Sequence, residues 1–459
     1  MKYISLVVLL SFLLSSCAPL QVSRGSAAAS KRKKQEIEAL YADEPVFFTQ
    51  EIEVYGEIET RVSAYHHEKG KDDIIADVRV DIGIDSQITE DVAIIASVRI
   101  QGDTANIYQG ATLDNHDGKK TIMSMREMYV EFTPDMNMDE LNIVLGKKIM
   151  QNTVNFDFAE FNALARRDQS EPFSTMDDYT QNGVIVANVS MKLSGDANLF
   201  GECAIAGRNN PVIATSSNDH WTHDLQPGMS YGDVEVGSDV NYLCRMWQER
   251  DNGTIFEVAI FHGSGSGIDH VVSKGVELAP VFVKETSVSA SAELTLGEWV
   301  TRLGCNAHFQ ESSDDFATCI VEVDRIWQFE NGSSLFVEMG YVNSFTTNDS
   351  DISISELDIR RSLDNHFVAM AEYSPSDGVT FRPSMAKSLN DDDFYFRLDA
   401  EAVLDAVLPS LATNAFFQNT VLTVRGEYID GESNSSGIED IFGAHKDDSR
   451  VMLIFKKEF

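Results

Sequence analysis

The chain has 459 residues, of which 43% are hydrophobic and 24% charged, and its formal net charge is −37 at pH 7. A chain of this length folds as two or three soluble domains or as one large barrel. The acidic balance excludes nucleic acid as a partner, because binding to a phosphate backbone needs clustered Lys and Arg. Acidic loops and an acidic interior favour cations or neutral solutes over polyanions.

The first segment of the chain is typical of a secretory signal. Lys2 precedes an apolar run from Ile4 to Leu14, which is too short to span a bilayer as a helix. The following LSSC, which ends at Cys17, resembles the bacterial lipobox. That resemblance implies export and lipidation of Cys17, and a plain signal peptide with an incidental Cys is the alternative. No later segment has the run of about 20 apolar residues that a membrane-spanning helix needs.

Segments with a two-residue alternation recur from residue 51 to the last residue. In EIEVYGEIETRVSA, Ile52, Val54 and Ile58 fall on one face, and Glu57 and Glu59 fall on the other. Successive strand side chains point to opposite faces, so each such segment predicts a strand with one apolar and one charged face. We count about 16–18 of these strands, and a bacterial barrel needs an even number. Residues 402–420 are either a helical loop or a weak strand.

The connections between these segments alternate in length. Short polar turns such as SQITED and TLGE separate the long stretches 102–122, 146–182, 207–238 and 263–284. A soluble sandwich also has regularly spaced strands, but it does not account for this alternation or for one charged face on nearly every strand. A transmembrane barrel accounts for both, and closure leaves no unpaired edge in the bilayer.

The sequence therefore predicts an all-β fold, a single transmembrane antiparallel β-barrel of about 16–18 strands with short periplasmic turns and long extracellular loops. We expect residues 1–17 to be the signal peptide and residues 18–48 to be a periplasmic linker with a short helix. The barrel itself is expected to occupy residues 49–459.

The last strand, RVMLIFKKEF, has its own signature. Val451, Leu453 and Phe455 share one face and are expected to contact lipid, with Phe459 at the membrane interface, closing the barrel against the first strand. Lys457 departs from this apolar face, but a Lys near a membrane boundary can extend its amine to water. A terminal strand ending in Phe resembles the assembly signal of Gram-negative outer-membrane barrels, which implies the barrel-assembly machinery as a partner.

Several motifs in order along the chain carry a family resemblance. MREMYVEF, LNIVLGKKIM, SASAELTLGEWVTRLGCNAHF, VEVDRI, FRPSMAKSLNDDD and DIFGAHKDDSRVMLIFKKEF are similar to segments of the alginate-export-like and related porin-type barrels. Where those families have Arg-Gln and often a Trp-Gly soon after, this chain has Lys147-Lys148 and no Trp. The resemblance implies a bacterial outer-membrane channel, passive or substrate-selective, that contacts outer-membrane lipids and passes small polar solutes. A homo-oligomer is compatible with it.

Side chains on the charged faces of the strands are the candidate pore lining, since selectivity in a pore depends on lining charge and constriction width. The alternative is that many of them form buried ion-pair ladders between neighbouring strands. The residues with this parity are Glu57, Glu59, Arg61, Asp77, Arg79, Asp81, Arg99, Glu127, Glu131, Arg245, Glu257, Arg302, Glu322, Arg397, Arg425 and Glu427.

The long loop 146–182 is the candidate constriction. It combines Phe156, Phe158 and Phe161 with the charged residues Lys147, Arg166, Arg167 and Asp168. A loop of this length is usually functional or disordered, and its aromatic residues argue against disorder. An ordered outer cap is the alternative.

Catalysis and metal binding have little support in the sequence. Neither a G-x-S-x-G nor an H-E-x-x-H pattern occurs, so we expect no enzyme, and a barrel hydrolase remains a weaker alternative. A plugged barrel acting as a surface adhesin or scaffold has the same sequence signature as a channel. Cys203, Cys244, Cys305 and Cys319 form no CxxC pair, so we expect no metal or other cofactor. Cys305 and Cys319 flank one hairpin and could pair, but we expect all four to be small apolar side chains.

Overall fold

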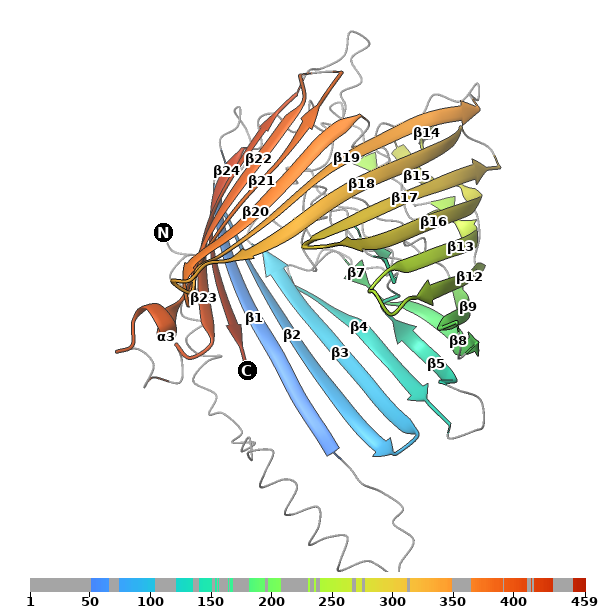
Figure 1. Cartoon of the computed structure of the whole chain (residues 1–459), viewed down its shortest axis with the longest axis horizontal. Helices are drawn as coiled ribbons and strands as arrows, with labels where there is room; N and C mark the ends of the chain where they lie inside the picture. Colours follow the sequence, from blue (N-terminus) through green and yellow to red (C-terminus); the bar gives the residue numbers. More distant parts are fainter. Residues whose placement is uncertain are drawn as a thin grey trace, which may run out of the picture.

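In the barrel sheet of the computed structural model, eighteen strands are hydrogen-bonded in one ring (Figure 1). The structure describes residues 51–65, 74–103, 121–134, 140–150, 153–154, 156, 164, 166–167, 181–194, 197–207, 230–231, 235–236, 240–265, 270–274, 277–311, 314–348, 365–390, 392–410, 414, 417–431 and 449–459. The predicted signal, Cys17 and the linker 18–48 lie outside these residues.

The strands of the ring follow the segments expected from the alternation. They are β1 Glu51–Tyr65, β2 Ile74–Thr89, β3 Val92–Asp103, β4 Thr121–Phe132, β5 Asn142–Lys148, β8 Val184–Ser194, β9 Leu199–Gly207, β12 Val240–Glu249, β13 Ile255–Ser264, β16 Lys284–Leu296, β17 Trp299–Gln310, β18 Asp315–Gln328, β19 Ser334–Asn348, β20 His366–Ser376, β21 Val379–Ser388, β22 Phe394–Val403, β23 Thr420–Asp430 and β24 Arg450–Glu458.

Each of these strands pairs antiparallel with the next one in this order, and β24 pairs antiparallel with β1. The sheet therefore has no free edge, and the predicted all-β barrel with an even number of strands is confirmed. Among the described residues, no helix is both long enough and apolar enough to cross a membrane.

The two faces of the wall differ in chemistry as the alternation predicts. On β2, Ile82 and Ile84 are exposed, whereas Asp77 and Arg79 are buried on the opposite face. The same division recurs around the ring, with exposed apolar side chains such as Leu453 on the outside. In the described strands, charged side chains with outward parity occur only near strand ends, as Lys147, Lys284, Arg325, Lys387, Asp430 and Lys457 do. An apolar belt between two charged rims is the surface that a transmembrane barrel presents to lipid.

The connections lie at two different ends of the barrel. At one end, called the turn end, most links are short, such as residues 90–91, 297–298 and 377–378, but the link 404–419 between β22 and β23 is long. The opposite end, called the loop end, carries the long links, but residues 311–314 and 389–393 are also short there. Strict alternation of short and long connections is therefore wrong at these three places.

Parts of the long links form small sheets that the sequence did not predict. Within the link from β5 to β8, β6 (Arg166–Arg167) pairs with β7 (Gln181–Asn182). In two other links, β15 (Glu277–Phe282) pairs with β10 (Ser230–Tyr231), β11 (Glu235–Val236) and β14 (His270–Lys274). Between β22 and β23, a short helix α3 (Leu404–Val407) is present, so that stretch adds no strand to the ring.

The cysteines differ from the expectation. Cys203 is bonded to Cys244 and Cys305 to Cys319, each pair joining two neighbouring strands. The partners are directly opposite in register, with Cα atoms 4.2 Å and 4.1 Å apart. The expectation of four unpaired apolar side chains is therefore wrong, because it ignored which residues the register sets face to face.

The end of the chain closes the ring against the first strand. The backbones of Gly56 and Phe459 exchange two hydrogen bonds, both of 2.9 Å. The ring of Phe459 covers Gly56 so closely that a Cβ built there would lie 2.4 Å from its Cζ atom. Gly56 thus provides the space in which the terminal aromatic ring lies.

Replacing Gly56 by Val is expected to displace the Phe459 ring and to weaken closure by about 1–3 kcal/mol, as overpacking does. The measurement is the temperature at which the folded barrel loses its compact migration in a gel. Gly426→Val is the matched control, since a Cβ at this outward position on β23 meets nothing within 4 Å. Equal stability of the two variants would contradict this role for Gly56.

Candidate pore wall

The inner face of β1 to β4 carries a ladder of alternating charges. Arg61 bonds to Asp77 at 2.9 Å and lies 3.7 Å from Glu59. One strand further, Arg99 bonds to Asp81 at 2.8 Å. Most of these side chains are buried, so they pair with each other rather than with water.

A second group lies on the inner face of β22, β23 and β24. Asp399 is fully buried and accepts hydrogen bonds from Arg397 and Arg425, the latter at 2.7 Å. Arg450 bonds to Glu427 and donates to the Tyr65 hydroxyl on β1 at 2.8 Å. This group continues the first across the closure, so buried arginines outnumber buried carboxylates from β22 to β3, while the partly exposed carboxylates Glu57, Asp81 and Glu401 offset that excess.

The wall from β16 to β19 has the opposite excess. Arg302 pairs with Glu293 at 3.0 Å, with Asp324, and with Glu338 at 3.3 Å. Glu322, which lies opposite Arg302 in register, is fully buried. Here one guanidinium is shared by three carboxylates, so acidic groups dominate.

These two walls face each other. In a ring of eighteen strands, β1 is half-way round from β16, and β24 is half-way round from β13 (Figure 1). The arginine-rich wall is centred on β24 and β1, and the acidic wall begins at the opposite side.

A third part of the inner wall is apolar and is covered by the link from β5 to β8. Met150 and Leu164 of that link pack in one buried cluster with the wall residues Val184, Val186, Ala204, Ala206, Leu243 and Phe261. Met150 and Leu164 therefore lie inside the barrel rather than above it.

A carboxylate also holds this link in place. Glu257 of β13 accepts hydrogen bonds from the backbone N–H groups of Thr153 at 2.8 Å and Val154 at 3.0 Å. The same carboxylate lies 3.7 Å from Arg245, which pairs with Glu202 of β9. Bonds to an ionised acceptor are among the strong ones, so Glu257 works as a latch for the link.

The structure places the predicted lining residues on the inner face of the wall, and it divides them by exposure. Glu59, Arg61, Glu322, Arg397 and Glu427 are among the buried ones, which the ladder alternative anticipates. The side chains of Glu57, Asp81, Arg245 and Arg302 keep some exposure and so can meet a solute. Glu127 and Glu131 are likewise half-buried; Glu127 accepts a bond from the N–H of Ile149 at 2.9 Å.

The residues predicted for the constriction do not all lie on the inner face. Lys147 is part of β5, and its register partners Met128 and Ile185 are exposed outward residues. Its Nζ donates to the carbonyl of Met125. Lys147 therefore belongs to the outer face, and its assignment to a constriction is wrong. Arg166 and Arg167 form β6, and Asp168 lies outside the described residues.

Sequence reasoning missed several inward charges. Glu338, Asp399 and Arg450 share the parity of residues that were named, so the signal was present. Arg126 was hidden by a bulge: Glu127 pairs with Ser97, and the next pair is Met125 with Val98. That extra residue turns Arg126 inward, where it lies 3.6 Å from Asp81.

Histidine and metal chemistry receive little support from the described part of the chain. No group of three His, Cys, Asp or Glu side chains in it is arranged to hold a metal ion. His308 is buried, bonded through Nδ1 to Glu285 at 3.1 Å and stacked on Phe316. The buried imidazole is not accessible to a substrate in this arrangement.

No known protein family and no curated protein matches this chain. Among solved structures, a BenF-like porin from Pseudomonas fluorescens Pf-5 is similar, with a TM-score of 0.51 at 9% identity over 90% of this chain and 99% of that chain. The chain has the fold of a porin-type β-barrel. OccK2 (OpdF) of Pseudomonas aeruginosa has a TM-score of 0.49 at 10% identity, and OpdK, solved with vanillate, has 0.48 at 8%. Each of these two covers 89% of this chain and 98% of its own.

Proposed function

We propose that this chain is an outer-membrane channel through which small hydrophilic solutes pass, with a preference for cations or neutral solutes. The observation that carries the proposal is a closed wall with an apolar belt outside and charged side chains inside. A wall of this kind needs lipid around it and water within it. A net charge of −37 adds to the preference for cations.

The link between β5 and β8 is the constriction in this proposal. It narrows the lumen on one side, because Met150 and Leu164 are packed on the inner wall and Glu257 holds the backbone between them. Solutes then pass between the covered wall and the arginine-rich wall. Asp81, Arg126 and Arg302, which keep partial exposure, are the charges that they meet.

Several finer assignments belong to the same proposal. The order of the motifs supports membership of the alginate-export-like and related porin families, with the Lys147-Lys148 departure noted. Lipidation of Cys17, recognition of the terminal strand by the barrel-assembly machinery and contact with outer-membrane lipids follow from the sequence signals. A homo-oligomer remains compatible with the exposed apolar belt.

A plugged barrel acting as an adhesin or scaffold is the second candidate, favoured by the small sheets within the loop-end links. A barrel hydrolase has less support, because the His308 imidazole is buried beside Glu285.

Swelling of liposomes that contain the purified chain tests the proposal. We expect swelling in isotonic arabinose and in lysine, and slower swelling in glutamate. A folded barrel that admits none of these solutes would overturn the channel and support the plugged alternative. Equal rates for lysine and glutamate would overturn the ion preference alone.

A further inference from the structure

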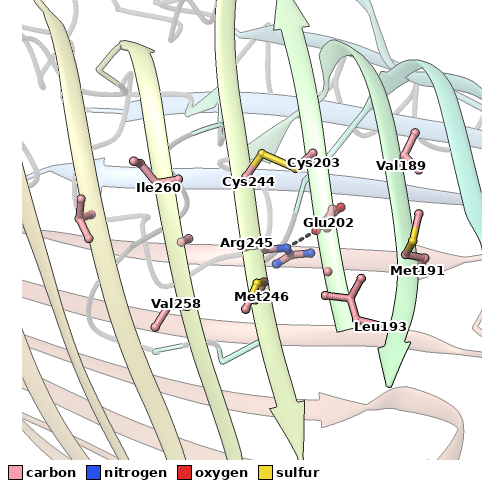
Figure 2. Close-up of a pocket in the computed structure, with 13 residues that line it drawn as sticks. Val189, Met191, Leu193, Glu202, Cys203, Cys244, Arg245, Met246, Val258 and Ile260 are labelled. Carbon is pink, nitrogen blue, oxygen red and sulfur yellow. Dashed lines mark hydrogen bonds and ion pairs between the residues drawn. A yellow bond between two sulfur atoms is a disulfide. The ribbon is translucent and has the colours of Figure 1, made fainter. Parts of the chain in front are cut away.

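The outer face of the barrel has an apolar groove of about 530 Å³ across β8, β9, β12 and β13 (Figure 2). Its floor is made of small residues, Gly201 and the disulfide between Cys203 and Cys244. Its sides are larger, with Met191 and Leu193 on β8 and residues of β13 opposite. Glu202 and Arg245, which also border it, pair with each other across β9 and β12.

The groove lies in the half of the membrane that faces the turn end. Val258 lines it, and Phe256 is the next outward residue on β13 toward the turn. Val258 and Phe256 are two strand positions apart, which is about 7 Å along the strand. Half of a bilayer's hydrocarbon core is about 15 Å thick. The groove is therefore at the depth of acyl chains in the leaflet at the turn end.

The side chain of Arg250 lies at the depth of the phosphate groups of that leaflet. The guanidinium of Arg250 lies 5.0 Å from the ring centre of Phe256, so it sits at the outer rim directly below the groove. Within the described residues, Arg250 has no carboxylate partner. The other outward cations at this end are engaged: Arg325 bonds to Glu298, and Lys457 donates to the carbonyl of Gln418 at 2.9 Å.

We propose that this groove and Arg250 form a binding site for one phospholipid, with an acyl chain in the groove and the phosphate on Arg250. The site rests on the proposed location of the barrel in a membrane. An apolar groove at acyl depth accounts for the chain, and a free guanidinium on a strongly acidic protein accounts for the phosphate.

Native mass spectrometry of the full chain, released from detergent with added phosphatidylglycerol, tests this site. We expect the wild type to retain one phospholipid and Arg250→Gln to need about five-fold more lipid for equal occupancy, the effect of one basic residue at a lipid surface. Val258→Trp fills the groove and is expected to abolish retention. Arg325→Gln is the matched control for Arg250→Gln. Val424→Trp is the matched control for Val258→Trp, since Val424 is 48% exposed and Val258 is 53% exposed.

The possible outcomes are distinct. Equal retention by the site variants and their controls, or none by the wild type, would overturn the lipid site. A wild-type dimer that Val258→Trp dissociates would make the groove a contact between copies and would also overturn it. Solute passage is measured on the same variants. Passage through a barrel that retains no lipid would overturn the lipid site but not the proposed channel. A wild type without passage would instead overturn the proposed function.

Discussion

Replacement of Arg302 by Met is expected to destabilise the barrel by about 3–5 kcal/mol, the usual loss when one partner of a buried ion pair is removed. The cause is the sharing of this guanidinium by Glu293, Asp324 and Glu338. Asp324 and Glu338 are buried, so water cannot replace the lost cation. Urea unfolding of the barrel in lipid vesicles, followed by Trp fluorescence, measures the change.

Arg325→Met is the matched control, because Arg325 lies one strand position from Asp324 but on the outer face, bonded to the exposed Glu298. An exposed pair contributes about 0–1 kcal/mol, so this variant should stay near wild-type stability. If Arg302→Met unfolds at the same urea concentration as Arg325→Met, the claim that Arg302 stabilises the barrel by pairing with three carboxylates is contradicted.

Replacement of Glu257 by Ala is expected to free the link between β5 and β8 and to raise the single-channel conductance. Glu257 accepts two backbone hydrogen bonds, from Thr153 and Val154. A bond to a charged acceptor contributes about 1.5–3 kcal/mol. Losing even one such bond therefore lowers the ratio of channels whose link is packed on the wall to channels whose link is detached by about 10- to 150-fold. We expect higher mean current and more current noise in planar bilayers.

Glu257→Gln tests whether the charge itself matters. Its amide oxygen can still accept from the same N–H groups, but a neutral acceptor makes a weaker bond. The expected conductance therefore lies between those of the wild type and Glu257→Ala. Conductance and noise that stay at wild-type values in Glu257→Ala would contradict the latch, because the apolar cluster around Leu164 would then hold the link alone.

The barrel and the sides of its wall were predictable because a strand side chain has a strict period of two. Glu57, Arg79 and Arg425 could be assigned to the inner face from parity alone, without knowledge of any partner. Arg126 could not, since one inserted residue in β4 reverses the parity and leaves no mark in a single sequence.

Features that depend on strand partners were harder to predict. The bond between Cys203 and Cys244 needs the register of β9 against β12, strands separated by a long link. The predicted loop 146–182 includes Lys147, yet β5 continues to Lys148.

The apolar patch of the inner wall that the link from β5 to β8 covers is visible in the sequence. GVIVA is apolar at both parities, and the small inward residues Ala204 and Ala206 interrupt the charged face. An apolar patch on the face that should meet water implies that another segment covers it.

Single-channel recording of the refolded wild-type chain in planar bilayers under a salt gradient tests the central claim most directly. The account predicts stable unit steps of current, with a reversal potential on the side of cation preference. A folded, heat-modifiable barrel that inserts into the bilayer and gives no steps would contradict it.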